Sequence, residues 1–178
     1  PSLYSSLAIF LCAALLWFVR HYHKQSGLRY RFHWLGLAVI FTFLGFDEAL
    51  GLHEELGDLV EEQNWFKAEG LLYFAWVVPY SILFLLFALS YLKFVFSLPR
   101  RIMLRFISAG ALFITGAVGF EIISAREADL HGSETIYYSA LYTIEELCEM
   151  ISMVIFSNGL LHYIRSEIGV INVSISEK

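Results

Sequence analysis

Five apolar stretches alternate with shorter polar segments along the chain. They cover about residues 3–19, 34–52, 71–96, 105–124 and 140–164. A hydrocarbon core of about 30 Å needs about 20 apolar residues in a helix, and a helix satisfies its own backbone polar groups. The pattern therefore predicts an all-α, polytopic membrane helical bundle with five transmembrane helices, built as a single transmembrane domain over residues 1–178.

The composition supports a membrane protein. Of the 178 residues, 58% are hydrophobic and 16% are charged, whereas an ordinary soluble domain carries about 25% charged residues. The mean hydropathy is +0.63, which is more apolar than one small globule can hide. The first stretch lacks the basic start and the A-x-A-like end of a signal peptide, so we predict that it is a span. The two cysteines form no zinc-binding pattern and no disulfide framework.

The basic residues predict the orientation. In the five-helix arrangement, ten of the twelve Lys and Arg residues fall on one side, and only Lys67 and Arg126 fall on the other. Because short basic loops stay in the cytoplasm, the N-terminus is expected outside and the C-terminus inside. Fifteen of the seventeen acids fall on the outer side. The rule for basic loops does not require this, so the acidic outer end needs a separate explanation.

Three of the stretches carry a carboxyl group at the same calculated depth. Sixteen residues separate that group from an inner arginine in each of three pairs: Arg31 and Asp47, Arg105 and Glu121, Arg165 and Glu149. At 1.5 Å per residue, each acid lies about 24 Å above its arginine. With about 30 Å of hydrocarbon, this level is expected inside the outer leaflet.

Further candidates surround this level. Asp47, Gly51, Glu54 and Asp58 follow helical spacing, which predicts one acidic stripe that rises to the outer surface. The small residues of the fourth stretch predict close packing against its neighbours, which would bring Glu121 inward. The candidate metal ligands are the acids of this level and the neighbouring histidine: Asp47, Glu48, His53, Glu54, Glu121, Glu145 and Glu149.

Ionised carboxyl groups at this depth are costly unless they are paired, hydrated or neutralised. Few protein cations lie nearby, so either the groups stay protonated or a bound cation neutralises them. Carboxylates with an imidazole suit a divalent ion such as iron, manganese, zinc or calcium. The E-x-x-H pair of ferritin-like di-metal proteins is missing, which disfavours a di-iron enzyme. Phosphate-binding and hydrolase motifs are also missing, and nucleic-acid binding has no footprint.

A simpler interpretation is a helix end that runs into a solvated acidic loop. It accounts well for Glu54, but poorly for Asp47 and Glu48, which come before the apolar stretch ends. Glu145 could equally lie at the membrane interface. His23 lies on the inner basic side, where we expect it to contact lipid headgroups.

Asp47-Glu48 followed by His53-Glu54 forms a D-E-x4-H-E element. This element resembles one found in small multi-pass bacterial membrane proteins of no known activity. The likeness covers about one span. It implies a multi-pass protein of the bacterial inner membrane. Together with the orientation predicted from the basic residues, this places the acidic face toward the periplasm or the exterior.

Three functions are compatible with these patterns. The preferred hypothesis is a divalent metal site in the outer leaflet that supports redox or hydrolytic chemistry, with Asp47, Glu121 and Glu149 as central ligands. The second is an accessory or structural subunit of a larger membrane complex, in contact with other membrane subunits and the lipid bilayer. The third is a proton or cation transfer element. The sequence leaves open whether the protein is an enzyme.

Overall fold

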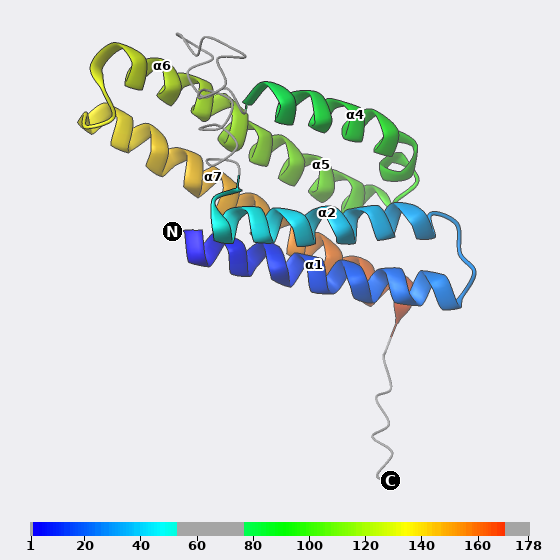
Figure 1. Ribbon diagram of the computed structural model, residues 1–178. Coiled ribbons are helices and arrows are strands. Elements are labelled where there is room, and N and C mark those ends of the chain that lie inside the picture. The colour runs from blue at the N-terminus through cyan, green and yellow to red at the C-terminus, as the bar shows by residue number, and fades with distance from the viewer. Residues whose placement is uncertain (1, 53–76, 170–178) are drawn as a thin grey trace, which may run out of the picture.

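The computed structural model describes residues 2–52 and 77–169, and within these residues every regular element is helical. In chain order the elements are α1 (Ser2–Gln25), α2 (Arg31–Leu50), α4 (Val77–Phe96), α5 (Arg100–Ile114), the π-helix η2 (Thr115–Phe120), α6 (Glu121–His131), α7 (Ile136–Tyr163) and the π-helix η3 (Ile164–Ile168). Figure 1 shows them as an antiparallel bundle. The predicted all-α helical bundle is confirmed.

Four helical segments are long and apolar enough to cross a membrane: Leu3–Gln25, Arg31–Leu50, Arg100–His131 and Ile136–Ile168. The described part of the predicted third span contains a shorter apolar helix, Ser81–Phe96. Residues 71–76 of that prediction lie outside the described residues. The count of five spans and the orientation therefore stay predictions, whereas the long apolar helices are those of a membrane protein.

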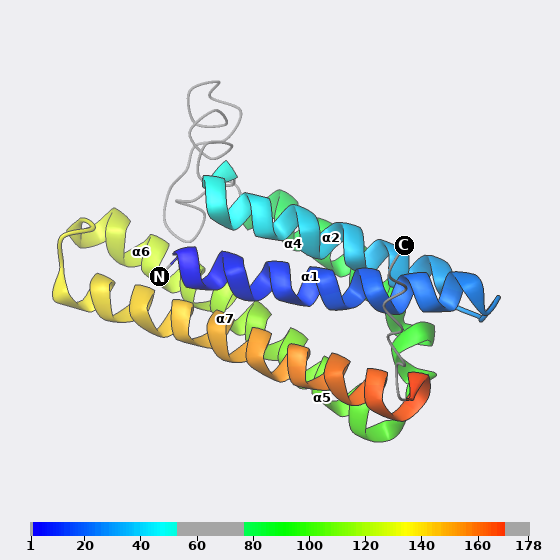
Figure 2. The ribbon, with the colours of Figure 1, turned by 90° about the horizontal axis from the view of Figure 1, so that it is seen from below.

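The two ends of the bundle differ in charge. We call the end where α1 finishes and α5 begins the basic end, and the end where α2 and α6 finish the acidic end. α1 packs against both α2 and α7, and α5 packs against α7. Figure 2 shows α1 lying between α2 and α7.

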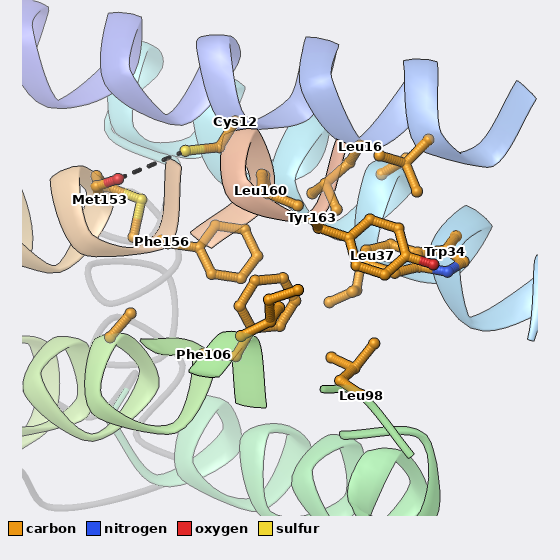
Figure 3. Close-up of a cluster of buried hydrophobic side chains, with 14 of the residues drawn as sticks. Cys12, Leu16, Trp34, Leu37, Leu98, Phe106, Met153, Phe156, Leu160 and Tyr163 are labelled. Carbon is orange, nitrogen blue, oxygen red and sulfur yellow. Dashed lines mark hydrogen bonds between the residues drawn. The ribbon is translucent and has the colours of Figure 1, made fainter. Parts of the chain in front are cut away.

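Aromatic side chains form the core in the basic half of the bundle. The rings of Trp34 and Tyr163 have centroids 4.8 Å apart, and Phe156 lies 4.6 Å from both Phe41 and Phe106. Figure 3 shows this cluster between α1, α2, α5 and α7. Aromatic rings bury about 150–250 Å² each and interlock in defined orientations. The cluster therefore fixes how these four helices are rotated relative to one another.

One side of α1 is apolar and exposed. Leu3, Leu7 and Leu11 are exposed along one side. Large exposed apolar surfaces are unusual on soluble monomers. In a bilayer the same surface faces hydrocarbon, so this side of α1 is suited to lipid contact.

The predicted acidic stripe extends beyond the end of α2, and its outer part lies outside the described residues. Helix α2 ends at Leu50, and Gly51 caps it with φ 65° while its N–H donates to the Asp47 carbonyl oxygen. Glycine has no Cβ, so it adopts this left-handed conformation at little cost and ends helices. Asp47 and Glu48 thus lie in the last turn of α2. His53, Glu54 and Asp58 lie outside the described residues.

Candidate functional site

The segment that carries Glu121 changes its helical form just before this residue. The π-helix η2 (Thr115–Phe120) joins α5 to α6, and Glu121 is the first residue of α6. A π-turn accommodates extra chain within a helix, so it rotates the following side chains relative to a regular α-helix. It therefore changes the face of the segment to which Glu121 belongs.

Gly116 allows η2 to pack closely on α7. A Cβ atom placed on Gly116 would lie 3.0 Å from the Cys148 Cβ, 3.0 Å from the Glu145 carbonyl oxygen and 3.3 Å from the Glu149 Cγ. No larger residue fits this approach without a shift of the helices. The close packing expected from small residues in the fourth stretch is confirmed at this position. Cys148 is a free, partly buried cysteine that takes part in the packing.

Glu145 is the buried carboxyl group of the site. Its side chain is 8% exposed, and its Oε2 atom is covered without a hydrogen-bond partner among the described residues. The Glu121 side chain lies within hydrogen-bonding reach of Glu145, and the carboxyl groups of Glu149 and Glu146 lie nearby. All these neighbours come from α6 and α7. An apolar bundle thus brings four carboxyl groups into one neighbourhood.

The Glu121–Glu145 contact restricts the protonation of the pair. An ionised carboxylate only accepts hydrogen bonds, whereas a protonated carboxyl group can also donate one. A hydrogen bond between the two side chains therefore requires that one of them carries a proton. Two ionised groups in this position would repel each other in surroundings that screen charge poorly.

Two other predicted ligands, Asp47 and Glu149, lie on α2 and α7. Asp47 is buried in the last turn of α2, and the nearby part of α2 packs on α1, where Gly45 faces the Phe10 ring. Glu149 lies against η2. Within residues 2–52 and 77–169, no group of three or more His, Cys, Asp or Glu side chains is placed to hold a metal ion. His53 and Glu54 lie outside these ranges, so the full predicted ligand set stays a prediction.

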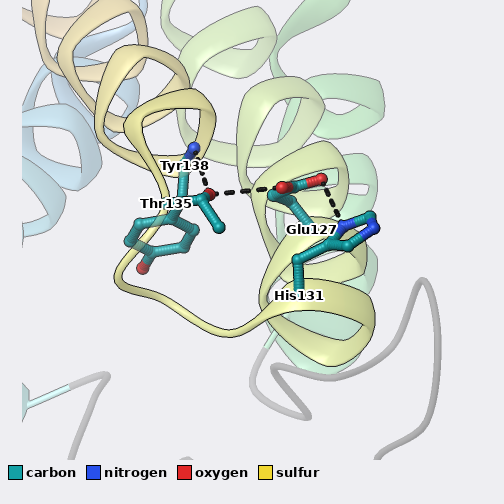
Figure 4. Close-up of polar contacts among 4 residues, drawn as sticks. All are labelled: Glu127, His131, Thr135 and Tyr138. Atoms are coloured by element: carbon teal, nitrogen blue, oxygen red, sulfur yellow. Dashed lines mark hydrogen bonds and ion pairs between the residues drawn. The ribbon is translucent and has the colours of Figure 1, made fainter.

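Beyond the site, the turn from α6 to α7 is held by a local polar network. His131 Nδ1 lies 3.1 Å from Glu127 Oε2, and the Thr135 hydroxyl donates to Glu127 Oε1 at 3.2 Å. The Tyr138 N–H donates to Thr135 Oγ1 at 3.0 Å and caps the start of α7. Figure 4 shows these contacts. Because they fix the turn that joins α6 to α7, they help to hold Glu121 opposite Glu145.

His23 is a buried polar residue that the sequence interpretation misplaced. It was expected to contact headgroups, but it is 6% exposed, and its Nε2 lies 2.8 Å from the Tyr163 hydroxyl oxygen. A signal for this burial exists in the sequence. Cys12, Leu16, Val19 and His23 follow helical spacing, and all four are buried. Extending the apolar face of α1 by one turn would have placed His23 inside.

Comparison with known proteins assigns the chain to a sequence family. A sequence profile described as a domain of unknown function, DUF8692, matches residues 1–164. The chain belongs to the DUF8692 family. The matched region includes η2, Glu121 and Glu145, so the candidate site lies within the family domain. No curated protein and no solved structure matches the chain.

Proposed function

We propose that this protein is a multi-pass membrane protein that transfers protons, and that Glu121 and Glu145 bind one proton between them. The observation that carries the proposal is the buried Glu145 carboxyl group, which lies within hydrogen-bonding reach of Glu121 and has an Oε2 atom without a partner among the described residues. Ionisable groups within spanning helices mark ion or proton pathways by default, because their burial is costly. A pair that needs a proton for its own contact is suited to accept and release one.

The charges around the pair support a proton as the neutralising species. The charged groups close to Glu145 include Glu121, Glu149 and Glu146, which are all carboxyl groups. Arg126, the arginine nearest in sequence on α6, is exposed. A proton removes the repulsion within the pair without the space and ligands that a larger cation needs.

The second candidate is the divalent metal site predicted from the sequence. The observation in its favour is that Glu149 and Glu146 also lie close enough to act on Glu145, since several carboxylates together attract a divalent cation. Glu121, Glu145 and Glu149 would be its ligands, with Asp47, Glu48, His53 and Glu54 as further candidates. Among the described residues, no three His, Cys, Asp or Glu side chains are placed to hold a metal ion together. We therefore prefer the proton proposal.

In this proposal the protein sits in a bacterial inner membrane with its acidic end toward the periplasm. Among the described residues, Asp47 and Glu145 are the buried acids, and neither lies in the basic half to continue a path from Glu145. A complete path would therefore need water molecules between the helices.

The experiment is proton flux into proteoliposomes that contain the purified full chain and an internal pH-sensitive dye. An imposed membrane potential, negative inside, should drive proton uptake through the wild-type protein, and Glu145→Gln should abolish it. The matched control is Glu134→Gln, which removes the same charge at an exposed position in the α6–α7 turn.

Two outcomes would overturn the proposal. Wild-type flux equal to that of protein-free vesicles would refute proton transfer by this chain. Elemental analysis that finds one bound divalent ion per chain, released by Glu145→Gln but not by Glu134→Gln, would establish the metal site instead, because carboxylate ligands must be ionised to bind metal.

A further inference from the structure

A small basic pocket lies at the other end of the bundle from the carboxyl pair. It has a volume of about 220 Å³ and is lined by Arg105 of α5, by Asn158, Leu161 and His162 of α7, and by Arg165 of η3. It lies where α5 begins and α7 ends, at the basic end. Glu121 and Glu145 lie sixteen and twenty residues away from its two arginines along the helices, which is about 24 and 30 Å.

Among the described residues, the Arg105 guanidinium group of the pocket has no counterion. The Nη1 atom of Arg105 is covered and has no hydrogen-bond partner among the described residues. Arg165 also lines the pocket and is exposed. The nearest acid along the chain, Glu167, accepts a hydrogen bond from the Ser166 hydroxyl at 3.2 Å. Two guanidinium groups that only donate hydrogen bonds therefore face one hollow.

The chemistry of these side chains selects an anion. Guanidinium groups form paired, charge-assisted hydrogen bonds with phosphate oxygens, and the Asn158 amide and His162 ring can add donors. A covered guanidinium nitrogen that lacks a partner costs free energy, and an anion would remove that cost. The pocket is smaller than the roughly 300–1,000 Å³ of sites that hold whole organic ligands. Its size suits one phosphate group.

The position of the pocket selects the source of the phosphate. It lies between the ends of two segments long and apolar enough to cross a membrane. Basic pockets at such helix ends bind the headgroups of anionic lipids. Leu161, which is exposed beside the arginines, offers an apolar wall for the glycerol and acyl part of a lipid.

We infer that the Arg105–Arg165 pocket binds the phosphate group of an anionic phospholipid at the basic face of the membrane. Such a lipid would tie the start of α5 to the end of α7. It would thereby stabilise the helix pair that carries Glu121 and Glu145 at its other end. The inference rests on the pocket alone and does not depend on proton transfer.

The test is thermal unfolding of the full chain in micelles, followed by tryptophan fluorescence and titrated with short-chain lipids. Dihexanoyl phosphatidylglycerol should raise the Tm of the wild-type protein, since a ligand that binds only the folded state stabilises it. Dihexanoyl phosphatidylcholine, which is zwitterionic, should raise it much less. Arg105→Gln and Arg165→Gln should each weaken phosphatidylglycerol binding about tenfold, as expected for the loss of a charge-assisted hydrogen bond.

The control variant is Arg101→Gln, which removes the same charge from an exposed position of α5 outside the pocket. It should keep the wild-type response. Arg165 is exposed, so its variant can be tested even if Arg105→Gln fails to fold. Equal responses of the wild type and both pocket variants would overturn the inference. If inorganic phosphate raises the Tm as much as dihexanoyl phosphatidylglycerol does, the pocket binds free phosphate, and the inference that it binds a phospholipid would be overturned.

Discussion

Replacing Gly116 by alanine should destabilise the bundle, whereas the same replacement at Gly110 should not. The added Cβ at position 116 would lie 3.0 Å from both the Cys148 Cβ and the Glu145 carbonyl oxygen, but at position 110 it would meet nothing within 4 Å. One of the crowded atoms at position 116 is backbone. The backbone cannot rotate away as a flexible side chain can, so the helices must shift.

The magnitude follows from comparing the two variants. Both exchanges gain up to about 1 kcal/mol because alanine is the better helix former. Only Gly116→Ala also pays for overpacking, at about 1–3 kcal/mol. The difference in unfolding free energy between the two variants should therefore be about 1–3 kcal/mol, with Gly116→Ala the less stable.

The assay is unfolding of the full chain in mixed micelles with a rising fraction of denaturing detergent. Tryptophan fluorescence, to which the buried Trp34 contributes, can report the loss of packing. Equal stability of Gly116→Ala and Gly110→Ala would refute the close approach of η2 to α7. The contact between Glu121 and Glu145 would then lose its structural basis.

Two further predictions concern the basic end and the topology. Tyr163→Phe keeps the ring packing but removes the 2.8 Å hydrogen bond to the buried His23. It should lower the unfolding free energy by about 1–2 kcal/mol in the same detergent titration. The control Tyr137→Phe, at an exposed position, should leave the unfolding free energy unchanged. If the N-terminus is outside, a cysteine within residues 63–67 should react with an impermeant thiol reagent added to intact cells, and one at Gln25 should not; the opposite labelling pattern would overturn the orientation.

The helices could be predicted from the sequence because burial in lipid imposes a long apolar run on each span. Their ends could not be predicted as well. The first apolar stretch stops near residue 19, but α1 continues through Arg20 and Lys24 to Gln25. Long basic side chains keep their charged ends in water while the helix backbone continues. Hydropathy therefore marks the hydrocarbon core and underestimates the helix.

The sequence predicted the depth of the acids in the membrane, but it did not predict which acids contact each other. Counting residues from the basic anchors placed Glu121 at the level of Asp47 and Glu149, whereas Glu145 was left open to a position at the membrane interface. Which acids meet depends on how two helices are rotated about their axes. The π-helix η2 changes that rotation just before Glu121, and a period of 3.6 residues cannot reveal it. In the sequence, Gly116 and the small residues near it were the signal for the close approach of η2 to α7.

Infrared spectroscopy of the purified full chain at neutral pH tests the shared proton most directly. A protonated carboxyl group has a carbonyl band distinct from that of an ionised carboxylate, and an exposed glutamate is ionised at this pH. The account predicts a protonated carboxyl band in the wild type that persists in Glu134→Gln and disappears in Glu145→Gln. A wild-type spectrum with no protonated carboxyl band, or one whose band survives in Glu145→Gln, would contradict it.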